Sequence, residues 1–110
     1  MPLYMTQFSY SAEAWAALAR KPENRKEAVS RLCQQLGGRL SALYYCFGEY
    51  DGVLIAEAPD EVTVTAILIA AIAPGHVRAT KTTVLLTPEQ AVEAMRRAGG
   101  VTYRAPGGPA

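Results

Sequence analysis

The chain has 110 residues and a mass of 11.8 kDa, which is the size of one ordinary domain. Half of its residues are hydrophobic and 19% are charged, and this composition excludes a disordered chain. Eleven Lys and Arg residues nearly balance ten Asp and Glu residues, so the charge gives no reason to expect a nucleic acid or an anionic membrane as partner. The single His excludes an all-His metal site within one chain, and Cys33 and Cys46 form no CxxC pair. We therefore expect neither a metal nor a cofactor.

The first third of the chain predicts a strand followed by helical segments. Residues 3–9 are a short run of apolar and aromatic residues, as in a strand. Ser11 then caps a helical turn, and Pro22 either breaks that helix or starts the next one. The clearest helix covers residues 22–36, because apolar residues recur there at helical spacing: Val29, Leu32, Cys33 and Leu36. Two glycines end it, since glycine adopts the left-handed conformation without a side-chain penalty.

The remaining elements complete a ferredoxin-like plan. They are, in order, a strand over 39–47, a turn over 48–52, a strand over 53–58, a helix over 60–73, a strand over 76–86 and a last helix over 87–98. Asp60 and Thr87 are the expected N-caps of the two helices. The order predicts an α+β fold of the βαββαβ type, with a four-stranded antiparallel sheet and a C-terminal helix. We expect one domain over 1–98 and a flexible tail, rich in Gly and Pro, over 99–110.

Two features of this plan predict self-association. A single sheet with helices on one side leaves its other face uncovered, and an exposed apolar sheet face is unusual in a monomer. The helical segment 62–73 carries no charge, and a helix that is apolar nearly all round is normally buried on more than one side. We therefore expect a homodimer, most simply a two-fold one, which could assemble further.

No segment of the sequence predicts secretion or membrane insertion. The first ten residues lack the basic segment and long apolar run of a signal peptide. As a helix, the apolar stretch 62–73 would span about 18 Å, against roughly 30 Å of hydrocarbon core. We expect a cytoplasmic protein without a membrane partner.

The segment from Leu36 to Asp60 resembles the GYD-domain family. The family's Gly-x-Tyr-Asp hairpin is found here as Gly48, Glu49, Tyr50 and Asp51. An aromatic pair precedes it, Glu-Ala-Pro-Asp follows it, and residues 75–78 are similar to the family's Gly-Asn-Val-Arg, with His76 in place of Asn. The resemblance covers roughly residues 2–95 and implies a branch of the dimeric α/β-barrel group, in which two sheets face each other and close into a barrel. It implies no catalytic residues, because the biochemical function of the family is not established.

The last strand carries the best candidate ligand site. Its alternate residues on one face are polar: His76, Arg78, Thr80 and Thr82. If that face looks into a barrel, these side chains could hold a small anionic or phenolic ligand, with Arg78 as the anchor for a carboxylate or phosphate. The alternatives are that His76 belongs to the preceding loop and that Arg78 pairs with Glu57 or Asp51.

Tyr44 is a further candidate contact for such a ligand. Tyr44 and Tyr45 are neighbours on a strand, so they point to opposite faces. We expect Tyr44 on the barrel side, because Tyr45 belongs to the more uniformly apolar set. The alternative is that Tyr44 packs in the core of a dimer.

The hairpin motif and the single Trp favour structural roles. The carboxylates of Glu49 and Asp51 could bind a cation or act as acid and base, but two such groups make a poor metal site. We favour turn chemistry, in which Asp51 caps its own backbone, Tyr50 packs on the neighbouring helix and Glu49 faces water. Trp15 could cover the mouth of a cavity, although packing at an exposed edge is the stronger interpretation.

Three hypotheses for function follow. The first is a homodimer that binds a small organic molecule in its barrel or in the cleft between sheet and helices. The second is an interaction or assembly module without a ligand. The third, by analogy from the fold alone, is a cofactor-free isomerase or oxygenase. A His76 whose pKa is shifted, beside Arg78 inside one pocket, would favour the enzyme.

Overall fold

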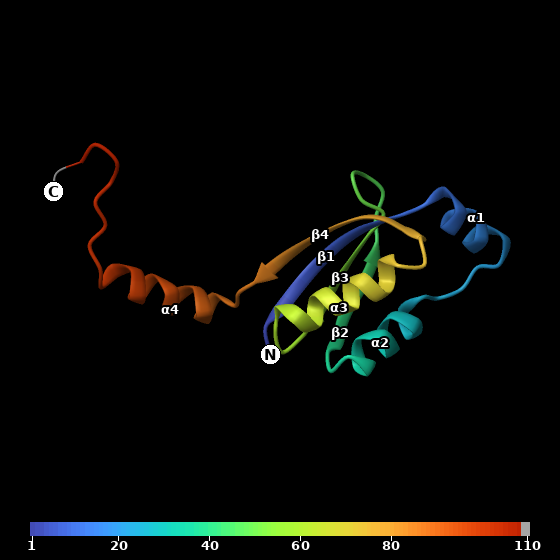
Figure 1. Ribbon diagram of the computed structural model, residues 1–110, viewed down its shortest axis with the longest axis horizontal. Helices are drawn as coiled ribbons and strands as arrows, with labels where there is room; N and C mark the ends of the chain where they lie inside the picture. The colour runs from blue at the N-terminus through green and yellow to red at the C-terminus, as the bar shows by residue number, and fades with distance from the viewer. Residues whose placement is uncertain (109–110) are drawn as a thin grey trace.

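Four strands and four helices make up the part of the chain that the computed structural model describes, residues 1–108 (Figure 1). They are β1 (Leu3–Tyr10), α1 (Ala12–Arg20), α2 (Lys26–Gln35), β2 (Arg39–Tyr45), β3 (Gly52–Glu57), α3 (Glu61–Ile72), β4 (Val77–Leu85) and α4 (Pro88–Gly99). The strands form an antiparallel sheet in the order β2-β3-β1-β4. This topology confirms the predicted α+β, ferredoxin-like fold. Residues 101–108 form neither helix nor strand, and the last two residues of the predicted tail, 109 and 110, lie outside the described residues.

The first helical region differs from the prediction in its boundaries. The turn expected after Ser11 extends into the nine-residue helix α1, and the helix expected from Pro22 begins only at Lys26. The Oδ1 atom of Asn24 accepts a hydrogen bond from the Lys26 backbone N–H at 2.9 Å. Such a local bond offers the backbone an alternative to the helix, which explains the later start.

Side-chain caps fix the starts of three helices. The Ser11 hydroxyl accepts from the Ala14 N–H at 3.1 Å, and the Asp60 carboxylate accepts from the Thr63 N–H at 2.9 Å. Thr87 and Gln90 form a reciprocal capping box at the start of α4. The predicted caps Ser11, Asp60 and Thr87 are therefore confirmed. Hydrogen bonds from Thr63 hold the pKa of the Asp60 carboxyl below its ordinary value.

One face of the sheet, here called the covered face, carries the core. Tyr4, Thr6 and Phe8 of β1 are buried on this face, against which α2 and α3 lie. Cys33 of α2 and Ile67 of α3 pack with Ala56 of β3 in one buried cluster, and Tyr4, Ala58 and Val64 form a second one. Burial raises the pKa of the Cys33 thiol.

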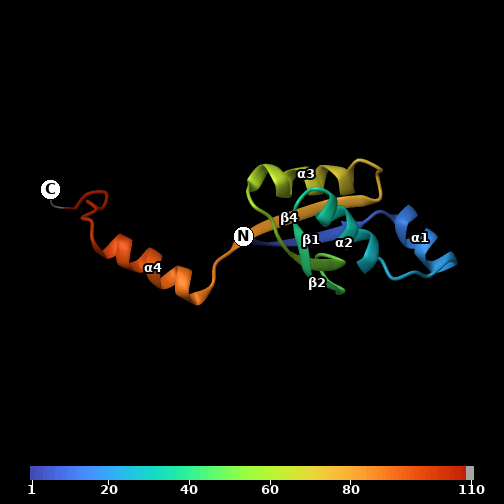
Figure 2. The ribbon, with the colours of Figure 1, turned by 90° about the horizontal axis from the view of Figure 1, so that it is seen from below.

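The other face, here called the open face, has no helix over it within residues 1–108 (Figure 2). The strand register assigns it these residues: Leu3, Met5 and Gln7 of β1, Ala42 and Tyr44 of β2, Val53 and Ile55 of β3, and Lys81 and Thr83 of β4. Its centre is apolar, with Met5 opposite Ile55, and Tyr44 at its edge has 67% of its surface exposed. The prediction of an uncovered sheet face is confirmed for this part of the chain.

Helix α4 extends away from the rest of the molecule (Figure 1). With α4 included, the molecule measures 64 × 30 × 22 Å along its principal axes. None of its residues is buried, and Val92 and Met95 are both exposed. A helix of this length is marginal in water without packing partners. None of the helices within residues 1–108 is long and apolar enough to cross a membrane.

Candidate functional site

The hairpin of the Gly-x-Tyr-Asp motif is joined to the start of the chain through Asp51. The Asp51 Oδ2 atom accepts hydrogen bonds from the Tyr10 backbone N–H at 2.9 Å and from the Trp15 Nε1–H at 3.2 Å. The Asp51 backbone N–H also donates to the Phe8 carbonyl at 2.8 Å. The expectation that Asp51 caps its own backbone is therefore wrong. Its carboxylate instead ties the β2–β3 turn to β1 and α1, and Glu49 is exposed as expected.

Aromatic rings pack around this anchor. The Trp15 ring lies edge-on to Tyr10 at a centroid distance of 5.2 Å, and both rings lie 6.2 Å from the Tyr45 ring. The hydroxyls of Tyr10 and Tyr45 share a hydrogen bond of 3.2 Å. Burial and this bond raise the pKa of Tyr10, while the positive charge of Arg25 partly offsets the increase. Trp15 is thus a packing residue at the α1 end of the sheet.

A cavity of about 430 Å³ lies between the covered face and the helices. Phe8 and Leu54 contribute to its floor, Leu32 of α2 and Ile67 of α3 to its walls, and α1 closes one end. The space of about 430 Å³ is open to solvent along part of its boundary, so it is not a dry void. The space therefore holds water or a ligand.

The structure separates the five residues of the predicted ligand site. His76 and Thr80 line the cavity, whereas Tyr44, Arg78 and Thr82 do not. Tyr44 lies on the open face, since it pairs with Val53. The predicted group on β4 therefore does not form one wall of a barrel.

The register of β4 explains this correction. Thr80 pairs with Phe8 and Thr82 with Thr6, so both threonines lie on the covered face. The hydroxyls of Thr6 and Thr82 share a hydrogen bond of 2.9 Å. The register shifts between Ser9 and Tyr10, and this bulge leaves Arg78 as the extra residue of β4.

Lys81 of β4 lies on the open face. It pairs with Gln7, which in turn pairs with Val53 opposite Tyr44, so the four side chains form one row across the open face. Alternate side chains of β4 point to opposite faces, but only the register with β1 decides which of them face the helices. The expected partners of Arg78 are also occupied, because Glu57 pairs with Arg39 at 2.8 Å and Asp51 binds Trp15.

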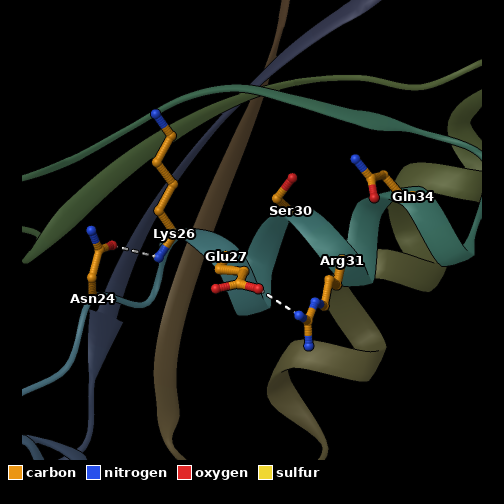
Figure 3. Close-up of a pocket in the computed structure, with 6 residues that line it drawn as sticks. All are labelled: Asn24, Lys26, Glu27, Ser30, Arg31 and Gln34. Atoms are coloured by element: carbon orange, nitrogen blue, oxygen red, sulfur yellow. Dashed lines mark hydrogen bonds and ion pairs between the residues drawn. The ribbon is translucent and has the colours of Figure 1, made fainter.

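A second hollow, on the outward side of α2, is lined by polar side chains (Figure 3). In Figure 3 the Glu27 carboxylate points to the Arg31 guanidinium, one turn further along the helix, and these two groups form an ion pair. Lys26 extends away from this pair (Figure 3). Because its charged groups are solvated, this surface is the solvent-exposed face of the helix and not a binding site.

The fold and the cavity define a small α+β protein of the ferredoxin-like type, with space for a ligand between its layers. A model of the GYD domain matches residues 4–95, so the chain belongs to the GYD-domain family. A relative from Thermus thermophilus, named glutamine synthetase and cystathionine beta-lyase binding protein, is 30% identical over 78 residues. These residues are 71% of this chain and 82% of that protein.

Solved structures with the same fold are distant in sequence. MtbAldR superposes with a TM-score of 0.57 at 13% identity. The match covers 78% of this chain and 53% of MtbAldR, so this chain spans about half the length of MtbAldR. A protein from Thermus thermophilus has a TM-score of 0.51 at 16% identity, with 79% and 95% of the two chains covered. A hypothetical protein from Pyrococcus horikoshii has a TM-score of 0.50 at 14% identity, with 79% and 92% covered. At these identities the likeness concerns the fold alone.

Proposed function

We propose that this protein is a homodimeric binding protein that holds a small organic molecule in the cavity between its sheet and helices. The cavity itself carries the ligand part of the proposal. Its lining is mostly apolar with a few polar groups, which is the usual composition of a small-molecule site. With roughly 30 Å³ for each water-sized unit, about 430 Å³ corresponds to on the order of a dozen non-hydrogen atoms.

The open face and α4 support the homodimer. The apolar centre of the open face, around Met5 and Ile55, has no cover within residues 1–108. Two copies that face each other would bury this surface between two sheets, as in other sheet-on-sheet packings. A partner copy would also offer packing surface to α4, whose Met95 is 67% exposed.

The homodimer is tested by size-exclusion chromatography with light scattering at micromolar concentration. Ile55→Asp places a charge at the centre of the open face and should give a monomer, because an unpaired charge is costly to bury. Ile69→Asp is the matched control, since Ile69 is 61% exposed on α3, away from the open face. A monomeric parent protein, or a dimeric Ile55→Asp variant, would contradict the open-face dimer.

Native mass spectrometry of gently purified protein tests the ligand. A retained molecule of stoichiometric mass supports the proposal and supplies the compound to identify. A protein that retains nothing, and takes up nothing from a small-molecule extract of its own cells, would contradict the ligand part and leave the assembly function.

A second candidate function is docking to other proteins. The relative named as a binding protein for two enzymes suggests it, and the outward side of α3 offers a surface. Val62 and Ile69 lie on that side, 79% and 61% exposed, on a helix without charge between residues 62 and 73. Purified glutamine synthetase from the same organism should then bind the parent protein and not Ile69→Asp. Equal binding of both, or none by the parent, would contradict docking of that enzyme through α3.

No observation favours the cofactor-free enzyme. That hypothesis needs His76 and Arg78 together in one pocket, and Arg78 does not line the cavity that His76 lines.

A further inference from the structure

The two charged side chains that line the cavity, Glu23 and Arg25, form an ion pair just before α2. Tyr10 is the last residue of β1, Arg25 directly precedes α2, and the His76 carbonyl accepts a hydrogen bond from the Ser11 N–H at 2.8 Å. The three side chains therefore line the α1 end of the cavity. The opposite end is walled by Ala56, Val64 and Tyr4, all buried, and the Tyr4 hydroxyl is its one polar group. A ligand that matches this lining has a mostly apolar body and a polar group at the α1 end.

The α1 end of the cavity has unused hydrogen-bonding capacity. Within residues 1–108 the His76 ring and the Thr80 hydroxyl make no hydrogen bond. The Arg25 guanidinium has five N–H groups and donates from Nη1 to the Glu23 carboxylate at 2.8 Å. Glu23 also lines the cavity, but its side chain is 53% exposed, so water can replace Arg25 as its partner when a ligand enters.

We propose that the ligand is an elongated apolar carboxylate, with its carboxylate on Arg25 and its chain along Phe8 and Leu54. This inference rests on the proposed ligand-binding function and names the class of molecule bound. Arg25 supplies the planar donor pair that matches a carboxylate, and the Tyr10 and Thr80 hydroxyls can complete its hydrogen bonds. An amine would have to compete with Arg25 for the Glu23 carboxylate, and an alcohol would use only one of the Arg25 donors.

Decanoate, decanol and decylamine are suitable probes, because their chain matches the size of the cavity and only the head group changes. Titration calorimetry on the full chain should show decanoate bound at least tenfold more tightly than either of the others. Arg25→Gln should lower the affinity for decanoate at least tenfold and leave the affinity for decanol within twofold of the parent's. Lys26→Gln is the matched control, since Lys26 is the next residue and lines the hollow on α2 (Figure 3) but not this cavity. It should leave the affinity for all three probes unchanged.

The results separate the inference from the proposed function. Equal affinity for decanoate and decanol, or an Arg25→Gln variant that binds decanoate like the parent, overturns the carboxylate assignment while the ligand site stands. Ala71→Phe fills the cavity from α3 and should abolish binding of decanoate and decanol; binding that survives it overturns the cavity as the site. If Arg25→Gln does not fold, Arg25→Lys keeps the charge without the planar fork, and a decanoate affinity equal to the parent's overturns the role of Arg25.

Discussion

The carboxylate of Asp51 provides the sharpest test of what the Gly-x-Tyr-Asp motif does. Asp51→Ala removes the acceptor of two hydrogen bonds, at 2.9 Å from the Tyr10 N–H and at 3.2 Å from the Trp15 Nε1–H. Hydrogen bonds to charged groups contribute about 1.5–3 kcal/mol each, and the longer bond belongs at the low end. We therefore expect Asp51→Ala to lower the free energy of unfolding by about 3–4.5 kcal/mol. At about 4 °C per kcal/mol, Tm should fall by roughly 12–18 °C.

Urea denaturation followed by the fluorescence of Trp15 measures this effect, because Trp15 is the only Trp and binds Asp51 directly. The chain concentration is held equal for all variants, since self-association changes the apparent stability. Asp51→Asn keeps one acceptor oxygen without the charge, so its free energy of unfolding should fall by about half as much as that of Asp51→Ala. Glu49→Ala, in the same turn but exposed, is the control and should stay within about 0.5 kcal/mol of the parent. The reasoning is refuted if Asp51→Ala and Glu49→Ala are equally stable.

Two further predictions concern titratable groups. The pKa of Asp60 is lowered by its hydrogen bonds from Thr63, so its contribution to stability is present above the unfolded value near 3.8 and is lost as the pH falls through the lower folded value. Asp60→Asn should flatten this part of the pH profile of unfolding, and an unchanged profile would contradict the cap. Cys33 is fully buried and its pKa is raised, whereas Cys46 is exposed, so a thiol reagent at neutral pH should label one Cys in the native protein and two in urea. Rapid labelling of both under native conditions would show that α2 does not hold Cys33 against the sheet.

The helices and strands were predictable because their signals are local. Asp60 and Thr87 cap helices through bonds to residues three positions on, and such bonds depend on sequence spacing alone. Gly37 has a φ of +90°, the conformation expected where a glycine ends α2. The sequence did not predict the late start of α2. The hydrogen bond between Asn24 and the Lys26 N–H is as local as the bonds of the helix, and the spacing of apolar residues does not indicate which of them forms.

The candidate site was predictable only in part. The alternation along β4 correctly separated Thr80 and Thr82 from Lys81 and Thr83, but the sequence contains no measure of which pair faces the helices. A shift of one residue in pairing exchanges the two faces, and the bulge at Arg78 interrupts the alternation itself. His76 and Thr80 thus reach the cavity, while Lys81 takes the place on the open face that Arg78 was expected to fill.

The sequence by itself determined the order of the elements, three of the helix caps, the uncharged helix and the family, because these depend on neighbours along the chain. The tertiary structure decided what depends on distant segments. It paired Asp51 with Trp15 across 36 positions, brought Arg25 and His76 to one end of a cavity, and placed Lys81 on the open face through the register of β4 with β1. The physical reason is that the partner of a hydrogen bond or the wall of a cavity is set by register and packing, and both are properties of the folded chain.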